Sequence, residues 1–303
     1  MIKIAMLGRS AGNGHPYSWS AIINGGYNEE RMKNQPFPAI YDYLSKEPKE
    51  NIGIEGAKVT HIWTEDRKDA VDIAAASLID NIVDNMEDEI GEVDAVIIGE
   101  DVGALHLELA KPFVEKDMPI FIDKPLTDNE ADLEQFIKYF RAGKKIMSSS
   151  GFSYAKEFEN ISEYGLGDVE YVNCLLNKAW STYGIHSTAG VYSILGGGVE
   201  SVVNLGREGF DSVHLEYKDG KQAVISQVYT AGLGRFDIIG SNGTKVVMEF
   251  DAFYMFKKQL EDFIDFVKTG KYPYPYEVTV EQIKVVIAGL KSRENKGKRI
   301  FIK

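Results

Sequence analysis

The stretch Pro119-Ile120-Phe121-Ile122-Asp123-Lys124-Pro125 decides the fold. An apolar run leads directly into a charged pair and a proline, which indicates a buried strand that ends at a polar edge. In α/β sheets, ligands gather beyond the carboxyl ends of the strands, where Lys124 would lie. An isolated Asp-Lys-Pro is more often a surface lysine at the end of a strand. The rest of the chain therefore has to supply the evidence for a site.

Strand-like and helix-like segments alternate around this stretch. Short apolar runs predict strands at 2–7, 58–63, 94–98, 119–122 and 145–147. Helices are expected from Pro16 onward and at 37–46, 66–89, 103–116 and 129–141. Residues 24–36 are expected to form a loop, as part of an insertion. Such alternation predicts an α/β fold with a doubly wound parallel sheet.

The pattern changes after about residue 150. Strand-like runs separated by turn signals follow at 169–176, 199–204, 212–217, 222–229, 236–240 and 245–249. Two helices, about 256–268 and 278–292, finish the chain. Consecutive strands joined by short turns predict a second domain of α+β type with a mostly antiparallel sheet.

The composition is that of a globular protein, with 303 residues, 44% hydrophobic residues and 26% charged residues. A net charge of −12 argues against a nucleic-acid partner. The single cysteine, Cys174, lies in an apolar run and indicates a reducing compartment. Because the chain has neither an apolar run of membrane-spanning length nor a signal peptide, we expect no membrane association and a cytoplasmic location. No His, Cys or carboxylate set has the spacing of a metal site.

A glycine-rich segment, residues 8–15, follows the first strand and has the sequence Gly-Arg-Ser-Ala-Gly-Asn-Gly-His. Glycines before a helix let a dinucleotide pyrophosphate approach the backbone. The usual G-x-G-x-x-G spacing is absent because Ser10 stands where the second glycine belongs. The motif alone is equally compatible with a phosphate cradle and with an ordinary turn, although Arg9 is available to pair with phosphate.

The order of these features resembles the glucose–fructose oxidoreductase/inositol dehydrogenase (Gfo/Idh/MocA) family of NAD(P)-dependent oxidoreductases. Lys124 is followed by Leu126-Thr127, an acidic helix at 129–141 and the strand 145–147. Gly184-Ile185-His186 comes next, and the segment 256–263 matches a family helix. The signature lysine of the family usually sits in Glu-Lys-Pro, and Asp123 is a variant.

The resemblance implies a Rossmann dinucleotide-binding domain at 1–148 and an α+β domain at 149–303 for substrate binding and oligomerisation, so a homodimer or homotetramer. It implies NAD or NADP as cofactor and a sugar- or polyol-like substrate. Lys124 would anchor the substrate oxygen and His186 would be the acid/base. Further substrate contacts are expected from Thr182, Tyr183 and Tyr154. The expected cofactor-binding residues are Gly8, Arg9, Ser10, Gly12, Asn13, Gly14, Thr64, Glu65, Arg67, Glu100 and Asp123.

Three further positions depart from the family pattern. Thr182 replaces an aspartate near the histidine, and Ala189 replaces a second acid. Thr64 stands where NAD-preferring folds carry an acid, which leaves the choice between NAD and NADP open.

Two other functions therefore stay open beside a dehydrogenase. One is an enzyme that uses tightly bound NAD as a recycling redox group for elimination or hydrolysis. The other is a nucleotide- or ligand-binding protein that has lost catalysis.

Overall fold

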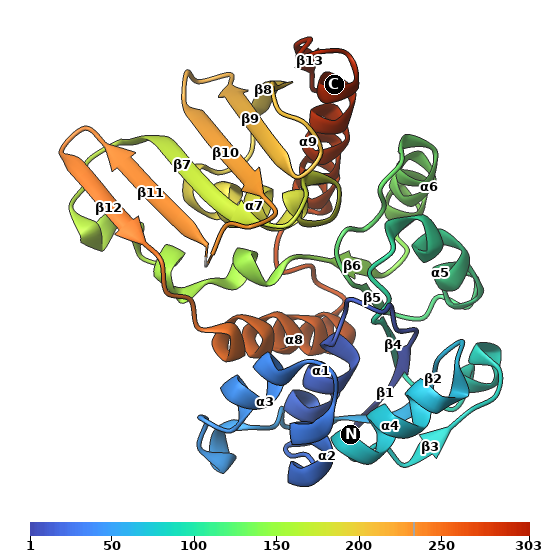
Figure 1. The fold of residues 1–303 in the computed structure, drawn as a ribbon. Helices are drawn as coiled ribbons and strands as arrows, with labels where there is room; N and C mark the ends of the chain where they lie inside the picture. Colours follow the sequence, from blue (N-terminus) through green and yellow to red (C-terminus); the bar gives the residue numbers. More distant parts are fainter. Residues whose placement is uncertain (233) are drawn as a thin grey trace. The chain divides into compact units, whose positions relative to one another are not determined.

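Figure 1 shows the fold of the chain in a computed structural model that describes residues 1–232 and 234–303. The chain divides into two compact units. The first contains residues 1–127, 134–148 and 256–274, and the second contains 128–133, 149–255 and 275–303. The segment 256–274, expected in the second domain, is thus grouped with the first unit. The boundaries 1–148 and 149–303 stay a prediction.

The first unit is built on a six-stranded parallel sheet with the order β3-β2-β1-β4-β5-β6. The order reverses beside β1, which is the switch point of a doubly wound sheet. The predicted fold of this half is therefore confirmed. Its strands are β1 (Ile2–Leu7), β2 (Ala57–Trp63), β3 (Asn81–Ile82), β4 (Ala95–Ile98), β5 (Ile120–Ile122) and β6 (Ile146–Ser148).

The helices of this half differ from the expectation in two places. Residues 24–36 were expected to form a loop, but they contain α2, which starts after the N-cap Asn28. The helix expected over 66–89 ends at Ser77, because Leu78 adopts a left-handed conformation with φ 60° and closes the helix. The helices are α1 (His15–Asn24), α2 (Glu29–Asn34), α3 (Pro38–Leu44), α4 (Arg67–Ser77), α5 (His106–Glu115) and α6 (Glu130–Arg141).

A late segment of the chain completes the core of the first unit. Helix α8 (Ala252–Thr269) brings Phe256 within 6.2 Å of the ring of Trp19 on α1, and Phe263 within 5.5 Å of Phe121 on β5, measured between centroids. Trp19, Phe121 and Phe263 are buried. Large aromatic side chains that meet in this way contribute strongly to a core.

The second unit contains a seven-stranded sheet with the order β12-β11-β7-β10-β9-β8-β13. Its strand pairs are antiparallel except β7 with β10, which run parallel. The predicted mostly antiparallel sheet is confirmed. The strands are β7 (Val169–Asn177), β8 (Val199–Asn204), β9 (Phe210–Tyr217), β10 (Gln222–Val228), β11 (Arg235–Gly240), β12 (Gly243–Val247) and β13 (Ile300–Phe301).

Helices α7 (Trp180–Leu195) and α9 (Tyr276–Glu294) pack against each other and against this sheet. Cys174 of β7 is fully buried in this layer, and burial raises the pKa of its thiol well above the ordinary value. A neutral, buried thiol is a structural residue rather than a nucleophile.

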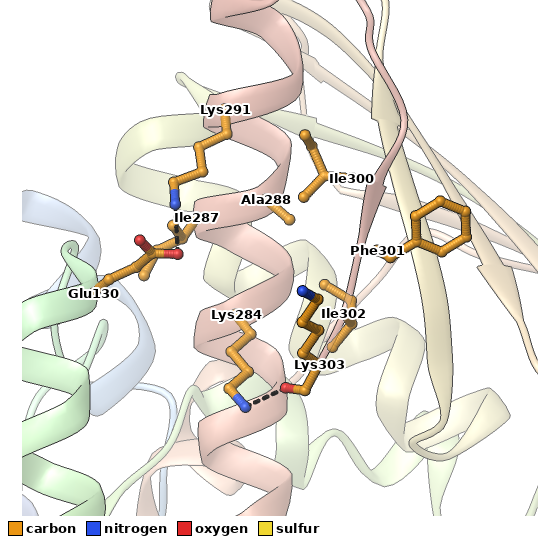
Figure 2. Close-up of a pocket in the computed structure, with 9 residues that line it drawn as sticks. All are labelled: Glu130, Lys284, Ile287, Ala288, Lys291, Ile300, Phe301, Ile302 and Lys303. Atoms are coloured by element: carbon orange, nitrogen blue, oxygen red, sulfur yellow. Dashed lines mark hydrogen bonds and ion pairs between the residues drawn. The ribbon is translucent and has the colours of Figure 1, made fainter.

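A cavity of about 260 Å³ lies in the second unit between α9 and the residues around β13 (Figure 2). Its walls combine apolar side chains with charged ones, and Lys291 is 2.5 Å from a carboxylate oxygen of Glu130. None of the predicted site residues lines it.

No helix in the described part of the chain combines the length and the apolar character that a membrane span requires. Among the same residues there is also no group of three His, Cys, Asp or Glu side chains arranged to hold a metal ion.

Glu89 gives the first unit a testable dependence on pH. Its side chain is buried, and neither carboxylate oxygen has a hydrogen-bond partner among the described residues. Burial, reinforced by Asp88, raises its pKa from 4.5 to about 9. The folded state therefore binds a proton that the unfolded state releases above pH 4.5. This contribution to the free energy of unfolding is complete below that pH and falls by up to about 1.4 kcal/mol per pH unit as the pH rises toward 9.

We expect Glu89→Gln to remove this fall and to stabilise the protein increasingly from pH 5 to pH 9 relative to wild type. Urea denaturation across that range measures it. The control is Glu87→Gln, an exposed glutamate of the same turn. If the free energies of unfolding of wild type and Glu89→Gln change in parallel with pH, the proposed effect of Glu89 is wrong.

Candidate active site

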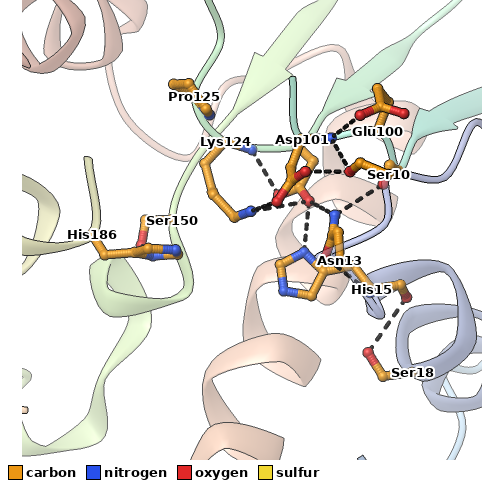
Figure 3. A network of polar contacts seen from close by, with 12 residues as sticks. Ser10, Asn13, His15, Ser18, Glu100, Asp101, Lys124, Pro125, Ser150 and His186 are labelled. Carbon is orange, nitrogen blue, oxygen red and sulfur yellow. Dashed lines mark hydrogen bonds and ion pairs between the residues drawn. The ribbon is translucent and has the colours of Figure 1, made fainter. Parts of the chain in front are cut away.

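Lys124 lies at the carboxyl end of β5, as predicted, and is only 5% exposed. Its Nζ is 3.2 Å from Oδ2 of Asp101 and 3.6 Å from Oδ2 of Asp123 (Figure 3). The Lys124–Pro125 peptide bond is cis. A buried ammonium held between two carboxylates is a fixed positive charge at the edge of the sheet where ligands bind in doubly wound folds.

Asp123 is the fully buried centre of this network. Its Oδ2 accepts a hydrogen bond from Asn13 Nδ2 at 2.6 Å and lies 2.6 Å from Nδ1 of His15, while its Oδ1 accepts from the backbone N–H of Lys124 at 2.7 Å. Burial opposes the ionisation of Asp123. The charges of His15 and Lys124 outweigh that effect and hold its pKa well below the usual range.

His15 had no role in the sequence analysis, yet it connects the glycine-rich loop to Asp123. It is the first residue of α1, and its ring stacks on Trp19 with centroids 4.3 Å apart. The Asp-for-Glu variant and the irregular loop thus contact each other, because Asn13 and His15 come from the loop and bind the shorter acid. A sequence pattern could not reveal this pairing, since the partners are 108 and 110 residues apart.

The glycine-rich loop is fixed by its own neighbours. Gly8 has φ +73°, a conformation that favours glycine. A Cβ on Gly14 would lie 2.8 Å from the ring of Phe37, so the predicted insertion packs directly on the loop. Ser10 donates its hydroxyl hydrogen to Asp101, and its oxygen accepts from the backbone N–H of Asp101 at 3.1 Å. The residue that breaks the glycine spacing therefore ties the loop to the lysine network.

The first turn of α1 offers few free donors for a phosphate. The N–H of His15 donates to Asn13 Oδ1 at 3.1 Å, and Pro16 has no N–H. The backbone N–H groups of Tyr17 and Ser18 both donate to the carbonyl oxygen of Gly14.

The loop itself keeps such donors. In the described part of the chain, no partner accepts from the backbone N–H groups of residues 9–12 and 14. Arg9 Nε is buried without a hydrogen-bond partner among those residues, although the guanidinium pairs with Asp69. A Cβ on Gly12 would meet nothing within 4 Å. Free N–H groups beside an arginine and open space fit a phosphate-bearing cofactor.

Most of the other predicted cofactor residues make their contacts with protein groups of the first unit. The hydroxyl of Thr64 donates to the carbonyl oxygen of Asp66 at 2.7 Å, and Arg67 pairs with Asp84. Glu100 is buried, and its Oε1 accepts from the backbone N–H of Asp101 at 3.0 Å. Glu65, just before the N-cap of α4, is exposed.

In the second unit, His186 lies on α7, 9% exposed. Its Nδ1 is 2.7 Å from Oγ of Ser150, and the ring of Tyr183 approaches it edge-on with centroids 4.6 Å apart. The hydroxyl of Tyr183 accepts a hydrogen bond from Lys178 Nζ at 2.6 Å. Sequence reasoning missed Ser150, whose only signal is its place just after β6.

Thr182 and Ala189, which stand at the family's acid positions, differ in their exposure on α7. Thr182 is exposed and Ala189 is fully buried. Tyr154, the remaining predicted substrate contact, is 7% exposed. Lys124 belongs to the first unit and His186 to the second, so their joint action on one ligand stays a prediction.

The glycine of the Gly-x-His motif has a packing role. A Cβ on Gly184 would lie 2.7 Å from the ring of Trp180, which is fully buried and donates its Nε1–H to the carbonyl oxygen of Val286 at 2.9 Å. The backbone N–H of Trp180 donates to Asp211 Oδ2 at 3.4 Å, and Arg293 Nη1 is 2.8 Å from Oδ1 of the same carboxylate. These contacts fix the first turns of α7 and with them the position of His186.

Comparison with known proteins relates part of the chain to an oxidoreductase family. Residues 41–150 match the family model GFO_IDH_MocA, described as an oxidoreductase family with an NAD-binding Rossmann fold. Over these residues the chain matches the Gfo/Idh/MocA family, and the predicted resemblance is confirmed. The matched family also agrees with the predicted nicotinamide cofactor. No curated protein sequence matches the chain.

Solved structures share the fold over nearly the whole chain. A putative myo-inositol dehydrogenase from Sinorhizobium meliloti has a TM-score of 0.76 at 17% identity, with 100% of both chains covered. The myo-inositol 2-dehydrogenase of Lactobacillus plantarum has a TM-score of 0.74 at 14% identity, covering 100% of this chain and 99% of the other. An oxidoreductase from Agrobacterium radiobacter, solved with NAD⁺, L-tartaric acid and magnesium, has a TM-score of 0.74 at 13% identity, with 99% and 98% covered. At such identities the likeness shows the fold alone.

The Asp123 network predicts a large effect of one substitution. Asp123→Asn removes the buried negative charge that His15 and Lys124 share, and we expect it to lower the free energy of unfolding by about 3 kcal/mol at pH 7. Because the folded-state pKa of Asp123 is depressed, its contribution exists above the ordinary value of 3.8 and is lost as the pH falls. The difference in the free energy of unfolding between wild type and Asp123→Asn should therefore become smaller in acid.

Urea denaturation at pH 7 and at a pH clearly below the ordinary value of 3.8 measures this effect. Asp117→Asn, at an exposed ion pair with Lys144, is the control and should change the free energy of unfolding by less than about 1 kcal/mol. Equal effects of the two substitutions would refute the central role of Asp123.

Proposed function

We propose that the protein is an NAD(P)-dependent oxidoreductase that acts on a secondary hydroxyl or carbonyl group of a sugar, polyol or related small molecule. The observation that carries the proposal is the buried ammonium of Lys124, held by Asp101 and Asp123 at the carboxyl end of β5. The family match of the surrounding segment supports the same reaction class.

Lys124 would bind the substrate oxygen and stabilise negative charge on it. A preorganised ammonium does this best in a site with little water, because its hydrogen bond is then strong. Asp101 and Asp123 keep the ammonium in place before a ligand arrives. His186 is the proposed residue for proton exchange with that oxygen. When bound, the nicotinamide supplies or accepts the hydride.

The cofactor phosphates would bind to the free N–H groups of residues 9–12 and 14, with Arg9 as the neighbouring cation. Ser10 and Asn13 would keep the loop in shape through Asp101 and Asp123. Arg67 already pairs with Asp84, so it is less available for the extra phosphate of NADP. We therefore expect NAD to be preferred, in agreement with the description of the matched family.

A homodimer or homotetramer in the cytoplasm is part of the proposal. β9, β12 and β13 carry exposed apolar side chains, Phe210 at 42%, Val246 at 43% and Phe301 at 59%. Exposed apolar residues on one sheet support its use between copies of the chain.

Nucleotide binding is the first measurement, by fluorescence titration with NADH and NADPH. We expect micromolar binding, tighter for NADH. Gly12→Ala should weaken it by about tenfold, because the new methyl group enters the space reserved for phosphate, which corresponds to about 1.4 kcal/mol. The control is Gly232→Ala, whose added Cβ likewise meets nothing within 4 Å. If folded wild-type protein binds neither nucleotide, the oxidoreductase proposal is wrong.

Lys124→Ala tests the chemical step. We expect turnover of a polyol or keto-sugar substrate to fall by at least about 10²-fold, with nucleotide affinity unchanged within about twofold. Lys116→Ala, at an exposed lysine beyond α5, should retain activity. Turnover without net change in NADH would instead favour a recycling redox group. Nucleotide binding with no reaction sensitive to Lys124 would favour a binding protein.

A further inference from the structure

Arg9 of the glycine-rich loop and Asp69 on the first turn of α4 form an ion pair within the first unit. The backbone N–H of Gly8 donates to the carbonyl oxygen of Trp63 at 2.9 Å, so the loop starts beside the end of β2. Helix α4 begins shortly after the same strand. The ion pair therefore links the glycine-rich loop to the segment that follows β2.

This edge of the sheet is where a doubly wound fold receives the adenosine ribose of a dinucleotide. An acid there accepts hydrogen bonds from the ribose hydroxyls of NAD, whereas an arginine there receives the 2′-phosphate of NADP. The expected position of the acid holds Thr64, which is 5% exposed and donates its hydroxyl hydrogen to the carbonyl oxygen of Asp66 at 2.7 Å. Because Thr64 carries no negative charge, an NAD ribose at this edge needs another acid.

The carboxylate of Asp69 has one oxygen in use and one available. Oδ1 pairs with Nη1 of Arg9, and Oδ2 has no hydrogen-bond or ion-pair partner in the described part of the chain. The side chain is 25% exposed, so it is held in place and still open to a ligand. A carboxylate only accepts hydrogen bonds. It can therefore bind ribose hydroxyls, and it repels a phosphate group, which is negatively charged and also an acceptor.

Arg9 is confined on more than one side. Its side chain is 15% exposed, and its Cζ lies 5.7 Å from the ring centroid of Phe37 in the insertion. Its Nε is buried and has no hydrogen-bond partner among the described residues. A guanidinium held in this way is already paired with Asp69 before a ligand arrives. Its Nη1 is therefore not available to a 2′-phosphate.

We infer that Asp69 is the residue that selects NAD over NADP. Its Oδ2 binds the hydroxyls of the adenosine ribose, its charge repels a 2′-phosphate, and its Oδ1 keeps Arg9 from binding that phosphate. The inference rests on the proposed function and names the residue that sets the cofactor preference of the same site.

Two other groups at this edge compete for the role. Glu65 is exposed and has no hydrogen bond or ion pair in the described part of the chain, so nothing fixes its carboxylate. Arg67 pairs with Asp84, but these side chains are 58% and 76% exposed, and solvent weakens such a pair. Asp69 differs from both because its charge is partly buried and is fixed by a residue of the glycine-rich loop.

The test is the ratio of the dissociation constant for NADPH to that for NADH, from fluorescence titrations. We expect wild type to bind NADH more tightly and Asp69→Asn to lower the ratio by at least about tenfold, or about 1.4 kcal/mol. Asp69→Glu keeps the charge and should keep the preference for NADH. Asp69→Ser replaces Asp69→Asn if that variant does not fold. A wild type that prefers NADPH, or an unchanged ratio without the acid, would overturn the inference.

Asp84→Asn and Glu65→Gln are the matched controls, because each removes one negative charge from the same edge. Both should change the ratio by less than about threefold. If Asp84→Asn lowers the ratio as much as Asp69→Asn does, the freed Arg67 decides the preference. If Glu65→Gln does so, Glu65 is the ribose acid. Either result contradicts the inference.

Arg9→Met tests the part assigned to the arginine. In this background Asp69→Asn should lower the ratio by no more than about threefold, because no guanidinium is left to be freed. A full tenfold fall without Arg9 would show that Arg9 takes no part. ADP and 2′,5′-ADP, which differ only in the 2′-phosphate, should show the same shifts by calorimetry. A shift confined to the whole dinucleotides would place the effect elsewhere and overturn the inference.

Failure of the proposed function gives a different result. If folded wild-type protein binds neither nucleotide, the proposed function is wrong and the inference falls with it. If the protein binds NADH and the ratio does not respond to Asp69, nucleotide binding stands and only the inference fails. Because these measurements need no turnover, the roles proposed for Lys124 and His186 do not affect them.

Discussion

A single buried negative charge organises the first unit. Asp123 has no exposed surface, so its charge is stable only because Asn13, His15 and Lys124 surround it. An ionised acid is destabilised by burial unless hydrogen-bond donors and cations surround it. The buried charge of Asp123 therefore requires its partners to stay in these positions. The position of Lys124, the path of the glycine-rich loop and the start of α1 all follow from that one requirement.

The departures from the family pattern gain a physical meaning in this setting. Serine in place of a glycine binds Asp101, and a shorter acid in the lysine motif is met by Asn13 and His15. In the second unit, Ser150 contacts the histidine that lacks its usual acids. In each case a polar side chain contacts the position that departs from the family pattern or the histidine beside it.

The strands could be read from the sequence because each is a short apolar run bounded by turn residues, as at Ile2–Leu7 and Ile120–Ile122. Lys124 was found because its charge interrupts such a run. The helix boundary at Ser77 was missed, since Leu78 adopts a conformation that leucine seldom takes. Ser150 and His15 could not be found either. Their partners are far away in the chain. A serine or histidine beside a loop can also have many ordinary structural roles, so neither residue stands out in the sequence.

Helix α8 has a consequence for how the chain acquires its structure. Residues 256–274 join the first unit although more than a hundred residues separate them from β6, and Phe256 and Phe263 cover Trp19 and Phe121. During synthesis the nucleotide-binding half must therefore wait, with these aromatic surfaces uncovered, until almost the whole second unit has left the ribosome. A fragment cut at residue 148 would carry the same uncovered surfaces permanently. Such a fragment would be prone to self-association. The first half of the chain therefore needs the later segment 256–274 to form a stable unit.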